Sequence, residues 1–267
     1  MRDDAALQAE AAQQAVAAAI EVARANFGRA LDIEVKGPRG DVVTSVDREA
    51  ERLIVSMLHE RFPEHAVLAE ESGALYGESD HVWLVDPLDG TNNYAYGLPL
   101  YGAAVTLCHR GEPVVTAIGE ATTGDVACAV KGRGVVVNGR PFERAASTPA
   151  GRPATALWVG YHTQSDPRLE MLASRLYGRS RRLFSTWAPT IDAFLYLRGG
   201  LDAVTAYQCT GTELLGALLL LRESGAEVRG VDGALVRNLA ELPELSFAGI
   251  RSVILPLIED CGLAAAL

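Results

Sequence analysis

The segment that most restricts how this chain can fold is a short apolar run that leads directly into a polar turn. The run Trp83-Leu84-Val85 has the composition of a buried strand, and Asp86-Pro87-Leu88-Asp89-Gly90-Thr91 follows it at once. Because the proline offers no amide to a strand ladder, we expect the strand to end there and the chain to bend. Asp86 and Asp89 can then converge on one point, and Gly90 lets the backbone approach a ligand closely. Amides that follow the glycine in a helical turn could bind a phosphate group.

Two more acidic clusters lie at the ends of predicted elements. Glu70-Glu71-Ser72 follows the apolar run Ala66–Ala69, so its carboxylates can reach the sheet edge that carries Asp86. Asp41 and Asp47 lie on either side of a predicted helix start, after a segment rich in Gly and Pro that indicates a loop. Each cluster alone is also typical of a helix cap or a solvated turn that binds nothing. Converging carboxylates repel unless a cation lies between them, and carboxylate oxygens are the ligands that Mg²⁺ prefers.

The order and spacing of these segments resemble the sequence pattern of the inositol monophosphatase family. That pattern is D-x-V-T-x-x-D, then G-E-E or A-E-E, then W-x-(I/V)-D-P-(I/L)-D-G-T-x-N-(F/Y). The chain carries Asp41-Val42-Val43-Thr44-Ser45-Val46-Asp47, Ala69-Glu70-Glu71-Ser72 and residues 83 to 94 in the same order. The resemblance extends from about Lys36 to Gly225. It implies a Mg²⁺-dependent phosphatase.

The resemblance also implies a set of metal ligands. Glu70, Asp86 and the carbonyl of Leu88 would hold one Mg²⁺, and Asp86 and Asp89 would share a second. The family's last motif, W-D-x-x-(A/G)-G, supplies an Asp to the second metal, and Glu213 stands at that position here. Its extra methylene adds roughly 1.5 Å of reach, whereas Mg²⁺ demands near-ideal octahedral geometry. We predict that Glu213 is a ligand; the alternative is that it only favours a helix start.

Catalytic and substrate-binding roles follow from the same resemblance. Asp47, Thr91 and Glu70 would be the catalytic residues, with Asp47 and Thr91 orienting the water that attacks phosphorus. The amides of Gly90 and Thr91 would bind phosphate oxygens. Lys36, on a loop that closes over the site, would contact substrate and help to hold a third metal, so that two or three Mg²⁺ ions are implied. A metal lowers the pKa of bound water and stabilises charge on the attacking and leaving oxygens.

The predicted substrate wall departs from the family. Trp187 and Pro189 stand where the family commonly has Gly and Ala, and Ala206 stands where animal inositol monophosphatases have a Glu that contacts the polyol. Trp187 would narrow the pocket and could stack on a sugar face or a base; the alternative is ordinary core packing. These changes favour a substrate other than myo-inositol 1-phosphate.

The remaining chain predicts a layered fold. An Ala-rich helix over about 4–27 and a second helix ending near residue 62 precede a meander of strands, and strands alternate with helices after residue 150. With the resemblance, this predicts a sandwich of alternating α-β-α-β-α layers that combines α+β and α/β halves. We expect an N-terminal half over 1–145, with an antiparallel sheet and most metal ligands, and a C-terminal α/β half over 146–267 with the substrate wall.

Charge and cysteine usage limit the function classes. The formal net charge of −10 disfavours binding to nucleic acid, and the longest apolar run is too short to span a bilayer. None of the four cysteines forms a C-x-x-C pair, so we expect buried free thiols and a cytoplasmic protein. The five histidines lie outside the motifs, and we expect them to be structural or on the surface. The resemblance further implies a homodimer.

The hypothesis that results is hydrolysis of a small phosphorylated sugar, polyol or related metabolite. One alternative is a phosphatase for a 3′-phosphonucleotide, which stacking of a base on Trp187 would favour. The other is a non-catalytic binding protein that retains the fold, for which Glu213 and the altered wall are the only support.

Overall fold

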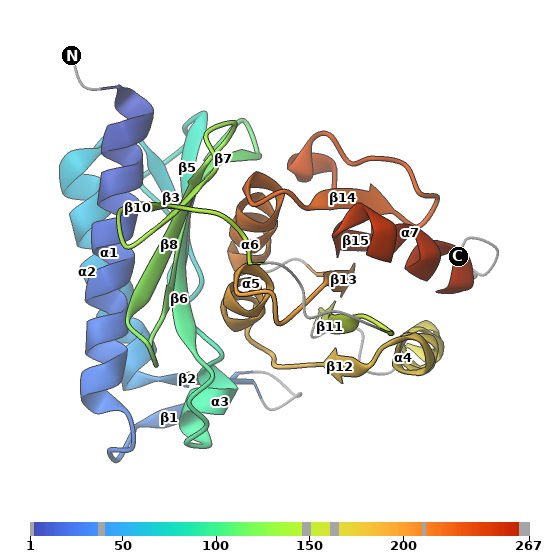
Figure 1. The fold of residues 1–267 in the computed structure, drawn as a ribbon. Helices are drawn as coiled ribbons and strands as arrows, with labels where there is room; N and C mark the ends of the chain where they lie inside the picture. The colour runs from blue at the N-terminus through green and yellow to red at the C-terminus, as the bar shows by residue number, and fades with distance from the viewer. Residues whose placement is uncertain (1–2, 37–40, 146–150, 161–165, 210–211, 262–267) are drawn as a thin grey trace.

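Helices and sheets alternate in five layers (Figure 1). The computed structural model describes residues 3–36, 41–145, 151–160, 166–209 and 212–261, with the backbone alone at 212, 213 and 261. The outer helices of the first half cover one face of an eight-stranded sheet, two helices lie between this sheet and a five-stranded sheet, and two more cover the far face. In that order the helices are α1 (Asp4–Asn26) and α2 (Ser45–Arg61), α5 (Pro189–Leu197) and α6 (Thr212–Glu223), and α4 (Pro167–Arg179) and α7 (Arg251–Cys261). The predicted α-β-α-β-α sandwich is confirmed.

The eight-stranded sheet has the order β10-β9-β8-β7-β6-β5-β3-β4. Its neighbours are antiparallel, as predicted, except that β3 and β5 run parallel. The sequence predicted strands over Ala66–Ala69, Gly102–His109 and Val135–Val137, which are the bounds of β3, β6 and β9, and it missed β4 and β10. The strands are β3 (Ala66–Ala69), β4 (Gly73–Leu75), β5 (His81–Asp89), β6 (Gly102–His109), β7 (Glu112–Glu120), β8 (Asp125–Val130), β9 (Val135–Val137) and β10 (Arg140–Phe142).

The five-stranded sheet is mixed and has the order β12-β11-β13-β15-β14. β11 runs parallel to both of its neighbours, whereas β15 is antiparallel to β13 and β14. The alternation of strands and helices predicted β11, β12 and β13 but neither β14 and β15 nor α7. The strands are β11 (Ala154–Val159), β12 (Arg182–Phe184), β13 (Ala203–Tyr207), β14 (Glu227–Gly230) and β15 (Leu245–Gly249). β10 ends before and β11 begins after the predicted boundary at 145/146, and that division stays a prediction.

A β-hairpin replaces part of the loop expected around residues 36–41. β1 (Ile33–Lys36) and β2 (Asp41–Thr44) pair antiparallel, and Lys36 lies opposite Asp41. The expected turn itself, residues 37–40, lies outside the described residues. The loop prediction was therefore wrong for its two ends, which backbone pairing fixes in extended conformation although most side chains of β1 are exposed.

Helix α6 packs unusually close to the eight-stranded sheet through Gly216. A Cβ on this residue would clash with Thr106 Oγ1 and lie 2.7 Å from Thr116 Oγ1. The two threonine hydroxyls lie 3.0 Å apart on β6 and β7 and hydrogen-bond to each other beneath the helix. Only a residue without a side chain lets the helix axis come this near.

Three of the four cysteines have described side chains. Cys108 and Cys128 are buried free thiols, as expected, whereas Cys209 is half-buried and its thiol donates to the Tyr207 carbonyl at 3.6 Å. The fourth, Cys261, has no described side chain. Among the helices of the described residues, none combines the length and the apolar character that crossing a bilayer needs.

Candidate active site

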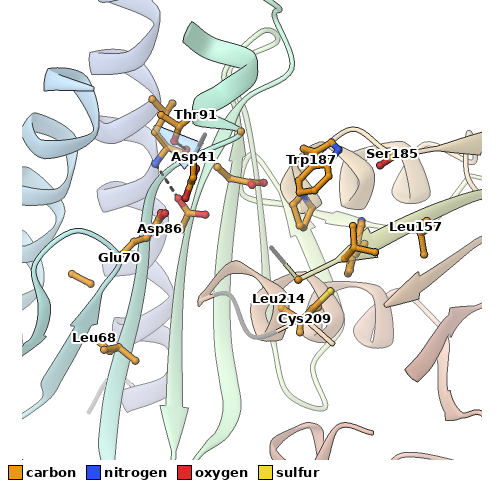
Figure 2. Close-up of a pocket in the computed structure, with 18 of the residues that line it drawn as sticks. Asp41, Leu68, Glu70, Asp86, Thr91, Leu157, Ser185, Trp187, Cys209 and Leu214 are labelled. Atoms are coloured by element: carbon orange, nitrogen blue, oxygen red, sulfur yellow. Dashed lines mark hydrogen bonds between the residues drawn. The ribbon is translucent and has the colours of Figure 1, made fainter. Parts of the chain in front are cut away.

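A cavity of about 470 Å³ lies between the two sheets and is lined by opposite kinds of residue on its two sides. Acidic and polar residues line the side of the eight-stranded sheet, and mostly apolar residues line the side of the five-stranded sheet (Figure 2). The acidic side includes Asp41, Glu70, Asp86 and Asp89 with Gly90 and Thr91, beside Leu68, Ala69, Gly73 and Leu88. The facing wall includes Leu157, Val159, Ser185, Trp187, Pro189, Cys209 and Leu214.

Parallel pairing of β3 with β5 brings Glu70 to Asp86. The Glu70 amide donates a hydrogen bond of 3.0 Å to the carbonyl of Val85, so the two acids follow neighbouring strand positions at one sheet edge. Figure 2 shows both side chains on the same side of the cavity. This is the convergence of distant acids that the sequence predicted.

The chain bends between Asp86 and Asp89 without leaving the sheet. The ladder of β5 with β6 shifts its register there, because Pro87 has no amide to donate, and pairing resumes where Asp89 lies opposite Gly102. The expectation that the strand ends at the proline was therefore wrong. Asp86 Oδ1 accepts a hydrogen bond of 3.1 Å from the amide of Leu88. The irregularity places the two acids and the Leu88 carbonyl in one short stretch.

Asp89 is buried and joins the two halves. Its Oδ2 accepts a hydrogen bond of 2.7 Å from the amide of Thr190 at the start of α5. Burial raises the pKa of Asp89 to about 7 against this hydrogen bond, and the charges of Glu70 and Asp192 raise it further. The pocket therefore holds more carboxylate charge than its own donors compensate.

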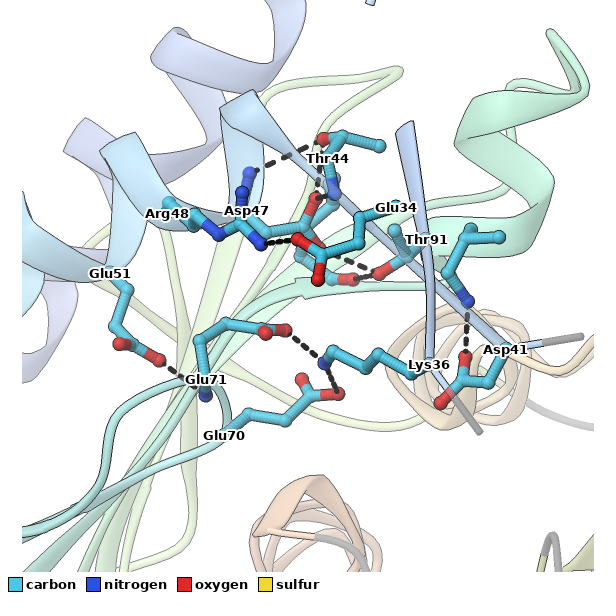
Figure 3. Close-up of polar contacts among 12 residues, drawn as sticks. Glu34, Lys36, Asp41, Thr44, Asp47, Arg48, Glu51, Glu70, Glu71 and Thr91 are labelled. Atoms are coloured by element: carbon cyan, nitrogen blue, oxygen red, sulfur yellow. Dashed lines mark hydrogen bonds and ion pairs between the residues drawn. The ribbon is translucent and has the colours of Figure 1, made fainter. Parts of the chain in front are cut away.

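Asp47 and Thr91 form a buried pair at the floor of the site (Figure 3). The Thr91 hydroxyl lies 2.8 Å from Asp47 Oδ1 and 2.8 Å from the Leu88 carbonyl, and its one proton can serve either acceptor. Asp47 Oδ2 accepts from the amide and the hydroxyl of Thr44, at 2.9 and 2.5 Å, in a capping box at the start of α2. Burial raises the pKa of Asp47, although these hydrogen bonds oppose the shift. The helix cap expected as an alternative thus coexists with contact to Thr91.

Lys36 reaches the acidic edge from the end of β1. Its Nζ lies 2.5 Å from Glu71 Oε1 and 3.7 Å from Glu70 Oε1 (Figure 3). Burial acts to lower the pKa of Lys36, but the hydrogen bond to Glu71 and the nearby carboxylates outweigh it and raise the pKa. Glu71 is fixed in turn, because its amide donates to Glu51 at 2.7 Å. The ammonium group therefore neutralises part of the edge that was predicted to bind metal.

Gly90 makes the turn between Asp89 and α3 (Thr91–Ala95) possible. Its φ of +87° is left-handed, and a Cβ there would lie 2.7 Å from the Leu100 carbonyl. The side-chain amide of Asn93 donates to the carbonyls of Leu100 and Thr186, at 2.8 and 2.7 Å. This clamp fixes the turn against the segment that leads into α5.

The other predicted substrate residues are placed differently from one another. Trp187 lines the cavity, but Ala206 is buried in the core cluster that contains Trp158 and does not line it. This placement argues against the predicted contact between Ala206 and substrate. Glu213 is the second residue of α6, and its side chain lies outside the described part of the structure.

Sequence reasoning gave no role to two groups near this wall. Cys209 lines the cavity, and no motif marked it. Asp192 is fully buried and accepts a hydrogen bond of 2.8 Å from the indole nitrogen of Trp158; burial raises the pKa of Asp192 to about 6. The only available signal was that Asp192 lies within the stretch, Lys36 to Gly225, over which the family resemblance extends.

The donor atoms of the acidic side fit Mg²⁺. Glu70, Asp86 and Asp89 are oxygen donors beside the Leu88 carbonyl, which is the ligand chemistry that this ion prefers. Within the described ranges, no three acidic, histidine or cysteine side chains already stand in a complete ligand arrangement. The ion pair of Lys36 with Glu70 is one physical reason, since Glu70 must turn from the ammonium group to bind a metal. The donor set fits, and the ligand roles of individual residues stay a prediction.

Comparison with known proteins agrees with this geometry. Residues 5–254 match the sequence profile of the inositol monophosphatase family. An inositol-1-monophosphatase of Mesorhizobium japonicum is 32% identical over 209 residues, which are 76% of this chain and 77% of that protein. The crystal structure of the extragenic suppressor protein SuhB from Bartonella henselae superposes with a TM-score of 0.83 at 23% identity, covering 94% of this chain and 97% of that one.

A further solved structure has a bound metal. An IMPase/NADP phosphatase complexed with Mg²⁺ and phosphate superposes with a TM-score of 0.69 at 21% identity, covering 86% of this chain and 85% of that one. At these low identities the two solved structures show a similar fold only. The family assignment rests on the profile match and on the Mesorhizobium relative, which are similarities of sequence. The chain belongs to the inositol monophosphatase family and is a phosphoric monoester hydrolase.

Proposed function

We propose that the chain hydrolyses the phosphate monoester of a small metabolite, such as a sugar or polyol, with Mg²⁺ and a water nucleophile. The observation that carries the proposal is the gathering of Glu70, Asp86 and Asp89 around one cavity beside the Asp47–Thr91 pair. Bound Mg²⁺ supplies Lewis-acid stabilisation of phosphoryl charge and a lowered pKa of water. Glu70, Asp86, Asp89, the Leu88 carbonyl and Glu213 would hold the two or three ions.

Asp47 and Thr91 supply the base in this proposal. As water attacks phosphorus and the bond to the leaving oxygen breaks, Thr91 Oγ1 takes a proton from the water and passes its own proton to Asp47 Oδ1, 2.8 Å away. The raised pKa of Asp47 favours proton uptake at this carboxylate. The departing alkoxide takes its proton from solvent.

Phosphate would be held where the chain turns into α3. Gly90 and Thr91 both line the cavity at this turn, and their amides would be the donors to phosphate oxygens. Lys36 would contribute by exchanging its carboxylate partners for phosphate, since it lies at the cavity edge on a hairpin arm.

The biological setting forms part of the same proposal. The buried free thiols Cys108 and Cys128 suit a reducing, cytoplasmic compartment. Three exposed apolar residues, Tyr96, Leu98 and Leu100, follow one another near α3 and suit burial against a second copy in a homodimer. Light scattering during size-exclusion chromatography would measure that state.

Replacing Asp89 with Asn tests the proposed function. The amide oxygen can still accept the Thr190 hydrogen bond, so the fold should survive while turnover falls by at least about 10³-fold. Released phosphate measures turnover across a panel of phosphorylated sugars and polyols with Mg²⁺, and calorimetry measures Mg²⁺ binding. Asp80→Asn is the matched control, because Asp80 is an exposed ion-pair partner of Arg110 far from the cavity lining. Substantial turnover by the Asp89 variant would contradict the metal assignment.

One observation favours a second substrate class. Trp187 lines the cavity and suits stacking on a base, as hydrolysis of a 3′-phosphonucleotide would require. The non-catalytic alternative has less support, because Asp47 and Thr91 are in direct contact. Failure of Mg²⁺ to bind in the presence of a substrate analogue would favour that alternative.

A further inference from the structure

Trp187 occupies a backbone position that suits glycine. Its φ of +55° lies in the left-handed region, which bulky residues rarely adopt and which strains the backbone where a fold enforces it. Its side chain lines the cavity and remains 37% exposed. The strained backbone therefore does not serve to bury the indole completely. It holds a partly exposed indole at the substrate wall instead.

The segment that carries Trp187 is fixed on both sides to the acidic edge. The Thr186 carbonyl accepts from the Asn93 side chain at 2.7 Å, and the Thr190 amide donates to Asp89 at 2.7 Å. Next to the tryptophan, Ala188 is fully buried, and its Cβ lies 3.1 Å from where a Cβ on Gly90 would stand. The indole is thus held at a set position relative to the proposed phosphate turn.

The wall around the indole offers little to a polyol. Its described side chains are Leu157, Trp158, Val159, Pro189, Cys209 and Leu214, and Ser185 supplies the one hydroxyl among them. Figure 2 shows Trp187, Leu157 and Leu214 across the cavity from Asp86 and Glu70. A flat apolar group fits among the described side chains of this wall, where a polyol finds one hydroxyl partner, that of Ser185.

We propose that Trp187 selects phosphate monoesters whose alcohol carries an aromatic ring, which stacks on the indole while the phosphate lies at the acidic side. The inference rests on the proposed phosphatase function and narrows its substrate class. The ring is that of an arylalkyl alcohol or of a nucleobase, and both present the same flat π-face. Trp187 is a specificity-determining residue in this scheme, and the chemical step belongs to the acidic side.

The test compares three esters in the wild type and in Trp187→Gly. 2-Phenylethyl phosphate and adenosine 3′-phosphate carry rings, and glycerol 1-phosphate carries none. Because glycine suits the left-handed backbone, the variant should fold at least as stably as the wild type. We expect the ratio of kcat/KM for the ring-bearing ester that the wild type prefers to kcat/KM for glycerol 1-phosphate to fall about tenfold in Trp187→Gly, which is about 1.4 kcal/mol. Trp187→Phe should retain most of the preference, and Tyr177→Ala, on the exposed face of α4, all of it.

Binding is measured separately with 3-phenylpropylphosphonate, in which a methylene replaces the scissile oxygen. Trp83 lies outside the cavity lining, whereas Trp158 and Trp187 both line it, so the part of the emission shift that is lost in Trp187→Gly reports on Trp187. Equal loss of kcat/KM for all three esters, or no preference for a ring in the wild type, would overturn the inference. No phosphate release from any ester, with the phosphonate still shifting the emission, would overturn the proposed function and support the aromatic site.

Discussion

Gly90→Ala should separate the two reasons for a glycine at the turn into α3. The left-handed φ of +87° costs an L-residue roughly 1–2 kcal/mol. The added Cβ would also lie 2.7 Å from the Leu100 carbonyl and 3.1 Å from Ala188 Cβ, and such overpacking costs roughly 1–3 kcal/mol. The free energy of unfolding should therefore fall by about 2–5 kcal/mol, the sum of these two terms. Relief of the clash must move the turn, and a shift of roughly 1 Å there should lower kcat about 100-fold.

Gly97→Ala is the matched control for this prediction. Gly97 has a φ of +75°, but no atom lies within 4 Å of where its Cβ would stand, so it bears the backbone cost without the clash. Urea denaturation should show a loss of about 1–2 kcal/mol for this variant, and phosphate release should show nearly unchanged kcat. Equal destabilisation of the two variants, with kcat unchanged in Gly90→Ala, would refute the argument that close packing positions the turn.

Three further predictions concern other parts of the chain. Thr91→Val should lower kcat by about 10²–10⁴-fold, because Asp47 loses its proton relay, and Thr91→Ser should restore it; equal rates of phosphate release in all three proteins would contradict the relay. Glu213→Asp should retain or raise activity with Mg²⁺, and a complete loss would mean that the backbone has adapted to Glu. Burial, with the nearby His81, lowers the pKa of His65 in the folded protein. As pH falls below about 6.5, the unfolded chain binds a proton at His65 more readily than the folded protein does, so the free energy of unfolding should decrease. His65→Phe keeps the stacking and should flatten the pH dependence of urea unfolding between about pH 5 and 7; an unchanged slope would contradict it.

The acidic segment at the end of β5 was predictable because its signals are local. Asp86, Asp89 and Gly90 lie within five residues, and apolar runs with clear ends set the bounds of β3 and β6. Parallel pairing then brought Glu70 to Asp86, which the common position of both acids at strand ends had suggested. The family resemblance suggested what these residues do, and the pairing of β3 with β5 explains why Glu70 and Asp86 lie close together.

Features that depend on distant partners were not predictable. β1 has mostly exposed side chains and exists because it pairs with β2, so its pattern resembled a loop. Ala206 was expected at the substrate wall, but the register of β13 between β11 and β15 turns it into the core. The left-handed backbone of Trp187 leaves no trace in residue spacing. Lys36 was expected over the substrate, and its two carboxylate partners emerge only when β1 and β3 are placed together.

The close packing of α6 on the eight-stranded sheet affects where the first turn of this helix lies relative to the cavity. Since Gly216 rests on the hydroxyls of Thr106 and Thr116, any side chain at that position would push the helix outward together with its first residues. Glu213 belongs to the same first turn, so its backbone distance from Asp86 and Asp89 is governed from one turn away. On the proposed metal assignment, a change at the buried glycine or at either threonine would alter ion binding while every proposed ligand stays the same.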